Sequence, residues 1–206
     1  MKFIDLFPKT IGIVQLQTLT PDLILRGIEH IERSSKVELG VNGSYTSDQQ
    51  LLEQELFREI KQEICTLCKT YAEGYSHIVQ EIGICNSWGN VVDHGQCIPA
   101  HKHNNSYISG SFYLTDGSTL AITNSDFNEL FGFMPQVKSG NYRSREVYCI
   151  DPEPGMLIMF PSALYHSVSK SRSYNKRYSI AFNTIPLGPT GMPTGLFDLS
   201  INRSAH

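Results

Sequence analysis

The sequence lacks the features that mark secreted, membrane-spanning or nucleic-acid-binding proteins. No apolar segment follows Met1, so a secretory signal is not expected. The longest apolar run, from about Gly155 to Phe160, is far shorter than a membrane span. The 17 basic and 20 acidic residues are mixed along the chain and give a net charge of −3. No basic stripe therefore indicates electrostatic tracking of nucleic acid.

Cysteine is scarce, and its odd count of five argues against a disulfide framework. Without an export signal, a reduced, cytoplasmic setting is the expectation. Cys65 and Cys68 form a C-x-x-C pair, but they fall inside a predicted helix, where they would share a face and pack into the core. A zinc site would need two further ligands, and none is well placed. Cys85, Cys97 and Cys149 lie in β-like runs and are expected in the core.

The length of 206 residues and the hydrophobic content of 40% fit one domain with a sizeable core. Within this single domain, 1–206, the pattern changes once. Residues 1–81 predict an N-terminal strand with supporting helices, residues 82–187 a β core, and residues 188–206 a tail that lies over the surface.

Two helices are predicted in the first third of the chain. Pro21–Arg33 follows Thr20, a suitable N-cap, and carries isoleucine and leucine at helical spacing. Asp48–Tyr75 shows the stronger apolar stripe, and the residues around Thr46 are placed for a capping box. Ile11–Leu16 predicts a strand before both helices.

Short β-rich runs broken by turn residues fill the region after residue 81. The candidate strands are Ile82–Val92, Cys97–His103, Tyr107–Thr115, Thr119–Thr123, Arg145–Ile150, Met156–Phe160, Tyr165–Ser169 and Arg177–Asn183. Strands of this number and length predict a mainly β fold, either a sandwich or a jelly roll. Residues 124–144 form the one long irregular insertion. Its aromatic residues, Phe131 among them, could form a lid over a pocket; the alternative is a loop that its aromatic residues attach to the core.

Three histidines carry the clearest chemical signal. His101 and His103 are two residues apart in a β-like run, so they would point to the same face, and His166 lies in another such run. Antiparallel closure of a barrel would bring His166 beside the pair, and three imidazoles can bind a transition metal. From the spacing alone, a metal site and ordinary hydrogen-bonded strand histidines both remain open.

Other polar residues of the β region are candidates for a pocket. Arg177 begins the last β-like run, and Ser179 would share its face, so the two could hold a carboxylate; the alternative is an arginine at the surface. Asn86, Trp88 and Asn90 alternate along one strand and would share a face, although a lone tryptophan is more often part of a core. Ser109 is a weaker candidate of the same kind.

From about Asn86 to Asn183 the chain resembles the 2-oxoglutarate/Fe(II)-dependent oxygenases, specifically the small group of putative 2OG-Fe(II) oxygenases common in bacteriophages and bacteria. The resemblance rests on Ser87-Trp88-Gly89-Asn90, His101-Lys102-His103, the stretch Pro154–His166 and the stretch Arg177–Asn183. It implies a double-stranded β-helix with His101 as the first iron ligand, His166 as the distal ligand and Arg177 as the clamp for the far carboxylate of 2-oxoglutarate. Asn86 and Ser179 are further candidates for binding this cosubstrate.

One position departs from the family pattern. The superfamily places Asp or Glu two residues after the first histidine, where this chain has His103. An imidazole there raises the charge of the site by one, which should tighten binding of a dianion. His103 is taken as a ligand; the alternatives are that it contacts substrate or that a carboxylate such as Asp93 replaces it.

The expected function is that of an oxygenase which hydroxylates a C–H bond and releases succinate and CO2. Two alternatives stay open: a cupin-like metalloenzyme that does not use 2-oxoglutarate, and a non-catalytic jelly-roll binding protein. The substrate could be a protein side chain, a nucleotide or a small metabolite, and the sequence does not decide. No membrane partner is expected, homodimerisation through the N-terminal helices stays open, and the expected location is the cytoplasm, that of the host if the gene belongs to a phage.

Overall fold

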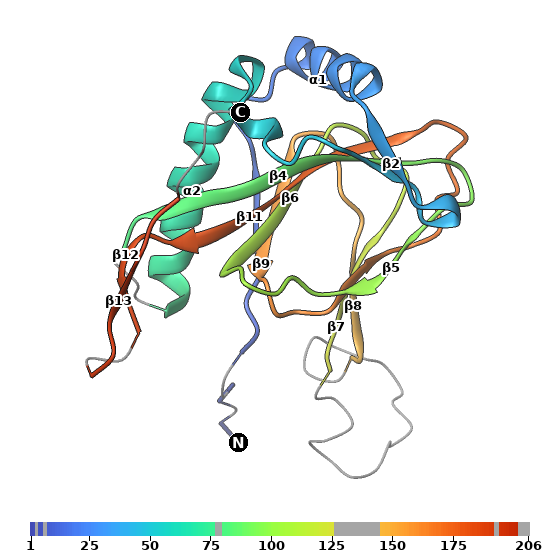
Figure 1. Cartoon of the computed structure of the whole chain (residues 1–206). Helices are drawn as coiled ribbons and strands as arrows, with labels where there is room; N and C mark the ends of the chain where they lie inside the picture. Colours follow the sequence, from blue (N-terminus) through green and yellow to red (C-terminus); the bar gives the residue numbers. More distant parts are fainter. Residues whose placement is uncertain (3, 6–7, 77–79, 126–144, 192–193, 202–206) are drawn as a thin grey trace.

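The computed structural model places two antiparallel β-sheets next to one another, with two helices against the outer side of the larger sheet (Figure 1). The structure describes the chain except residues 3, 6–7, 77–79, 126–144, 192–193 and 202–206. Phe131, the lid candidate, lies outside the described residues. Among the residues described, no helix combines the length and apolarity needed to cross a membrane.

The first helix, α1 (Pro21–Arg33), has the predicted bounds. Thr20 begins it as predicted: its hydroxyl accepts a hydrogen bond from the backbone N–H of Leu23 at 3.2 Å, and Pro21 occupies the first helical position. One face of α1 packs on the larger sheet through residues such as Ile31, which is fully buried.

The second helix begins ten residues later than predicted, because α2 spans Arg58–Ser76 and two short 3₁₀ helices, Leu51–Glu53 and Glu55–Phe57, precede it. The side chain of Asp48 accepts a hydrogen bond from the N–H of Gln50 at 2.7 Å and so closes a local turn. The N–H of Leu52 donates to the hydroxyl of Ser87 on the sheet at 2.8 Å. These competing partners hold residues 48–57 against the sheet and out of an α-helix.

The larger sheet has the strand order β1-β9-β6-β11-β4-β3-β2. Its strands are Gly12–Gln15 (β1), Met156–Pro161 (β9), Ile108–Tyr113 (β6), Arg177–Pro186 (β11), Ile82–Val92 (β4), Ser44–Thr46 (β3) and Lys36–Glu38 (β2). The hairpin of β2 and β3 was not predicted. Two further short strands, Gly188–Thr190 (β12) and Phe197–Leu199 (β13), form a hairpin where a plain surface tail was predicted.

The smaller sheet has the order β5-β10-β7-β8, with strands Ile98–His101 (β5), His166–Val168 (β10), Leu120–Thr123 (β7) and Val147–Ile150 (β8). From β4 to β11 the chain crosses repeatedly from one sheet to the other. β4, β6, β9 and β11 belong to the larger sheet, and β5, β7, β8 and β10 to the smaller one. Two sheets exchanging strands in this way form a double-stranded β-helix, the jelly roll predicted from the sequence.

Two hydrophobic cores follow from this layering. The larger core joins α1 and α2 to the outer face of the larger sheet and includes Cys68, as expected for the C-x-x-C pair. The smaller core lies between the sheets and includes Tyr113, Ile158 and Phe160 of the larger sheet with Ile122 of the smaller one. Cys149 is exposed, so its expected place in the core is wrong.

Candidate metal centre and adjoining pocket

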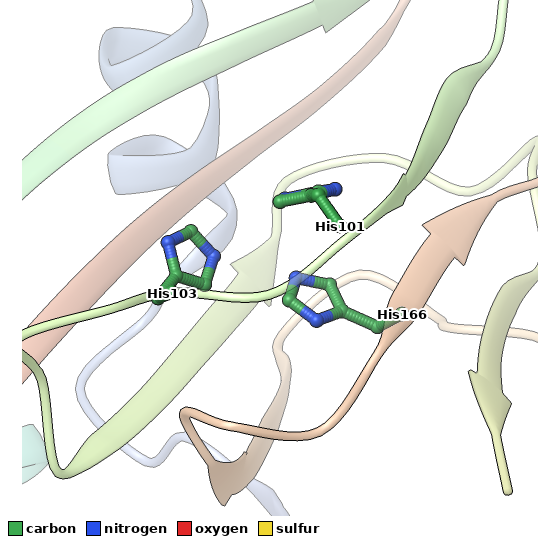
Figure 2. Close-up of side chains that lie close together, drawn as sticks. All are labelled: His101, His103 and His166. Carbon is green, nitrogen blue, oxygen red and sulfur yellow. The ribbon is translucent and has the colours of Figure 1, made fainter. Parts of the chain in front are cut away.

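The three predicted histidines converge at one end of the smaller sheet. His101 ends β5, His166 begins β10, and the two are direct cross-strand partners. One ring nitrogen from each of His101, His103 and His166 can be chosen so that all three lie within 4.8 Å of one another. Figure 2 shows the three rings gathered around a common space. Imidazole nitrogens at such separations can share one transition-metal ion.

Hydrogen bonds orient two of the three rings. Nδ1 of His101 lies 2.9 Å from the carbonyl oxygen of Pro99, and Nδ1 of His166 lies 2.9 Å from that of Leu164. A carbonyl oxygen only accepts, so each Nδ1 carries the proton and each Nε2 keeps a lone pair for a metal. Burial lowers the pKa of His166 to about 4, and burial together with the neighbouring His101 lowers that of His103 to about 4. Both rings are therefore neutral at pH 7, as a metal ligand must be.

His103 lies two residues beyond the end of β5, so the predicted strand Cys97–His103 is too long at this end. A loop places the ring instead, and its backbone N–H is held by the carbonyl oxygen of Ser162 at 2.9 Å. Within the described residues, no carboxylate belongs to the histidine group. Asp93 follows β4, and its neighbour Val92 pairs with Arg177. Asp93 is therefore not placed with the three histidines.

Arg177 lies at the start of β11 with its side chain almost completely buried, which rules out the surface arginine considered from the sequence. Its guanidinium carbon is 4.9 Å from the ring centre of Tyr113, a cation–π contact. The Nε and Nη1 atoms have no hydrogen-bond partner in the described structure. Burial lowers the pKa of Arg177, but a guanidinium remains charged in a protein. Arg177 is thus a buried cation with unused donors, and a carboxylate matches that requirement.

The strand register places Arg177 on the face that looks toward the smaller sheet. Ser179, two residues along β11, shares that face and is the cross-strand partner of both Tyr113 and Asn90. Tyr113 belongs to the core between the sheets, which fixes the direction of this face. Continuing along β11, Asn183 also lies on it and pairs with Asn86.

A pocket of about 440 Å³ opens beside the histidines. It is lined by Val37, Leu39, Asn42, Ser44, Tyr45, Ser47, Gln49, Asn86, Trp88, Asn90, Ile98, His101, His103 and Asn183. The predicted pocket residues Asn86, Trp88 and Asn90 are all present. The Trp88 ring is 5.7 Å from that of His103, so this tryptophan is not simply a core residue.

Two features of the pocket were not expected from the sequence. Ser109 does not line it; the hydroxyl donates to Oδ1 of Asn183 at 2.6 Å from behind. Asn183 itself lines the pocket and was not singled out, although its spacing from Arg177 along one strand could have shown that the two share a face. The hairpin of β2 and β3 also lines the pocket, and because the sequence did not predict the hairpin, it did not predict this part of the lining either.

A second, larger cavity of about 1120 Å³ lies elsewhere on the smaller sheet. It is lined by residues that follow β8 and β10 and precede β7, including Asp151, Lys170 and Ser118. None of the three histidines lines it. Its size alone therefore gives no reason to place the metal chemistry there.

Comparison with solved structures gives the class of fold. HygX from Streptomyces hygroscopicus, solved with nickel and 2-oxoglutarate bound, is 11% identical with a TM-score of 0.60, and the match covers 86% of this chain and 83% of that one. A Pseudomonas putida prolyl-4-hydroxylase is 14% identical with a TM-score of 0.58, covering 85% and 92%. The epimerase SnoN from nogalamycin biosynthesis is 12% identical with a TM-score of 0.62, covering 96% and 91%. These structures share the double-stranded β-helix of this chain. A comparison with the curated protein sequences found no match.

The sequence match then gives the family. The family model for putative 2OG-Fe(II) oxygenases matches residues 86–183, which include all three histidines and Arg177. Residues 86–183 thus match the 2-oxoglutarate- and Fe(II)-dependent oxygenases, and the resemblance seen in the sequence is confirmed. The donor sets fit the two groups in the family name. Three imidazoles suit Fe(II), and the unused donors of Arg177 suit a carboxylate.

Proposed function

We propose that this oxygenase is a hydroxylase whose iron is held by His101, His103 and His166 and whose 2-oxoglutarate is held at its far end by Arg177. In the overall reaction R–H, O2 and 2-oxoglutarate give R–OH, succinate and CO2. One oxygen atom enters the alcohol and the other enters succinate. The iron, when bound, supplies oxygen activation, and the protein supplies binding and orientation. The three histidines would bind the iron through their unprotonated ring nitrogens.

One observation carries this proposal: Arg177 is buried, and two of its nitrogens have no hydrogen-bond partner among the described residues. A buried donor without a partner costs about 1–3 kcal/mol, and more when the group is charged. A fold retains such a cost at a site that a ligand completes. Arg177 faces the space between the sheets, into which a keto acid chelated at the histidines would extend. Ser179 lies on the same face and is a candidate second donor to the far carboxylate.

Asn86 is proposed to act at the other end of the cosubstrate. It lines the pocket with His101 and His103, whereas Arg177 pairs with Val92, six residues further along β4. Six residues of a strand span about 20 Å, so Asn86 is too far from Arg177 to hold the same carboxylate. A contact near the iron-binding end of 2-oxoglutarate is the role that this position allows.

The choice of hydroxylation over other oxidations rests on analogy. Among the similar structures are a prolyl-4-hydroxylase and an epimerase, so the fold supports more than one outcome. A cupin-like metalloenzyme without a keto acid leaves the buried Arg177 without a role. A non-catalytic jelly-roll protein leaves the three histidines without one. We further propose that residues 1–206 act as one domain, because the larger core joins both helices to the β-helix.

The test is an anaerobic titration with Fe(II), followed by 2-oxoglutarate, in which the visible absorption band of a keto acid chelated to Fe(II) is recorded. We expect the band in the wild type, no band in His166→Ala and a much weakened affinity for 2-oxoglutarate in Arg177→Met. Arg172→Met, at an exposed position away from the histidines, is the matched control and should behave as the wild type. Iron binding without a band would favour the cupin-like alternative, and no iron binding would favour the non-catalytic one.

A further inference from the structure

The pocket beside the histidines has a lining whose charge and hydrogen-bonding directions are unusually well defined. The described residues that line it include amides, hydroxyls, aromatic rings and aliphatic side chains, but no Asp, Glu, Lys or Arg. A charged group of the substrate inside this pocket would have no counter-ion among them, and an unpaired buried charge is costly.

The amide of Asn90 has its orientation set by Trp88. The indole Nε1–H of Trp88 can only donate, and it lies 3.1 Å from Oδ1 of Asn90. The carbonyl oxygen of Asn90 is therefore turned toward the Trp88 indole. Because the amide is planar, its NH2 group lies on the other side and offers donors to whatever occupies the pocket.

Asn183 is turned in the same sense by a chain of serine hydroxyls behind it. Ser109 donates to Oδ1 of Asn183 at 2.6 Å, and the Ser109 hydroxyl is itself 2.8 Å from that of Ser162. Ser162 also lies 2.8 Å from Ser106, so the group is held from several sides. The NH2 group of Asn183 has no acceptor among the hydrogen bonds of the described residues.

Another part of the pocket lining has the reverse polarity. Gln49 uses its Nε2 to donate to the carbonyl oxygen of Thr46 at 3.1 Å, which leaves the amide oxygen as an acceptor. The pocket thus presents NH2 donors from β4 and β11 and a carbonyl acceptor from the segment after β3. The rim carries the half-exposed aliphatic side chains of Val37 and Leu39.

We infer that the part of the substrate bound in this pocket is uncharged and rich in acceptor oxygens, with Asn90 and Asn183 as specificity-determining donors beside the Trp88 ring. Carbonyl oxygens of a peptide and hydroxyl oxygens of a sugar share this chemistry. A cationic group, such as an alkylammonium, is disfavoured beside Asn90 and Asn183, because their NH2 groups repel it and no carboxylate in the described lining neutralises it. This inference rests on the proposed function for the identity of the site, since it describes the substrate of that same centre.

Trp88, the only tryptophan in the chain, gives a direct measure of pocket occupancy through its fluorescence. Two matched pairs of probes separate charge from framework. One pair is methyl glucoside and its 2-amino analogue, and the other is the capped tripeptides acetyl-Ala-Gln-Ala-amide and acetyl-Ala-Lys-Ala-amide. We expect the neutral member of at least one pair to bind the wild-type protein about tenfold or more tightly than its cationic partner, and the responding pair identifies the source of the oxygens.

Asn90→Asp keeps the oxygen that accepts from Trp88 but replaces the NH2 donor by a second acceptor. Neutral probes should bind this variant about tenfold more weakly and cationic probes more tightly, and Asn183→Asp should act in the same direction. Asn175→Asp makes the same charge change at an exposed residue outside the pocket lining and is expected to bind all probes as the wild type does.

The inference is overturned if the cationic probes bind the wild type as well as the neutral ones, if no probe changes the Trp88 emission, or if Asn90→Asp and Asn175→Asp behave alike. It is also overturned if Asn90→Asp abolishes the 2-oxoglutarate band, because the amide would then belong to the cosubstrate. The fluorescence titration needs no metal. A wild type without the band would therefore refute the proposed function and leave the pocket titration readable.

Discussion

Replacing Arg177 by methionine is expected to stabilise the ligand-free protein while it removes affinity for 2-oxoglutarate. Methionine fills a similar length of buried space without a charge. The substitution removes two buried nitrogens for which the described part of the chain offers no hydrogen-bond partner, each of which costs about 1–3 kcal/mol. It also removes the cation–π contact and the side-chain hydrogen bond with Tyr113, which together contribute about 1–3 kcal/mol in the other direction.

The cost of the unpaired donors is the larger effect, so the net gain in the free energy of unfolding should be about 1–3 kcal/mol, or roughly 2–10 °C in Tm for a domain of this size. The assay is thermal and urea unfolding of both proteins, first alone and then with 2-oxoglutarate and Mn(II) in place of iron. At a ligand concentration of about 100 Kd the wild type should gain about 2.7 kcal/mol, and Arg177→Met much less.

A ligand-free Arg177→Met protein that is less stable than the wild type would refute this reasoning. That result would mean that partners in the folded protein already satisfy the guanidinium and that no ligand is needed to complete it. Arg172→Met is the control for loss of one positive charge, and its stability should stay within about 0.5 kcal/mol of the wild type, as is usual for exposed positions.

Three further predictions concern the metal, the packing and pH. His166→Ala should lose stoichiometric Fe(II), measured by elemental analysis of the dialysed protein; retained iron would place the metal elsewhere. Gly110→Ala would put a Cβ 2.5 Å from a phenylalanine ring carbon and should destabilise the fold by at least about 1–3 kcal/mol. Gly74→Ala has nothing within 4 Å of the added Cβ and should stabilise the fold by about 0.5–1 kcal/mol. Equal unfolding midpoints for the two variants would contradict this prediction. Burial raises the pKa of Glu63, but two backbone N–H groups and the Thr18 hydroxyl lower it by more. Because the folded pKa lies below the ordinary value of 4.5, the stabilisation is present above that pH and is lost as pH falls through the folded pKa; in Glu63→Gln this part of the acid-unfolding profile should be absent.

The sequence predicted the β core well because that core repeats a simple physical pattern. The predicted strands Ile82–Val92 and Met156–Phe160 differ from the observed ones by at most one residue. Both are long apolar or alternating runs bounded by turn residues, and both bury one face or two. The start of α2 could not be predicted in this way. Leu51 and Leu52 look like part of the helical stripe, but a hydroxyl from the sheet takes the backbone bond that an α-helix would need.

The convergence of the three histidines was predicted more completely than the lining of the pocket. Alternation along a strand and the family pattern together pointed to His101, His166 and Arg177, and these are long-range contacts of a regular fold. The wall built from β2 and β3 was missed because strands of three residues carry too little periodicity to be recognised. The direction of the Asn90 amide could not be predicted at all, since it depends on which neighbour donates to the oxygen.

The cross-strand pairing of His101 with His166 has a mechanical meaning. β5 is an edge strand of the smaller sheet, attached on one side only, and it ends at His101. An ion coordinated by His101 and His166 would cross-link this edge strand to β10. Through His103 it would also hold the loop that follows β5 in place. Removal of the metal should then loosen residues 98–103 selectively, visible as faster amide hydrogen exchange there than in β4 or β11. In this protein the metal would secure the edge of a sheet as well as serve the chemistry.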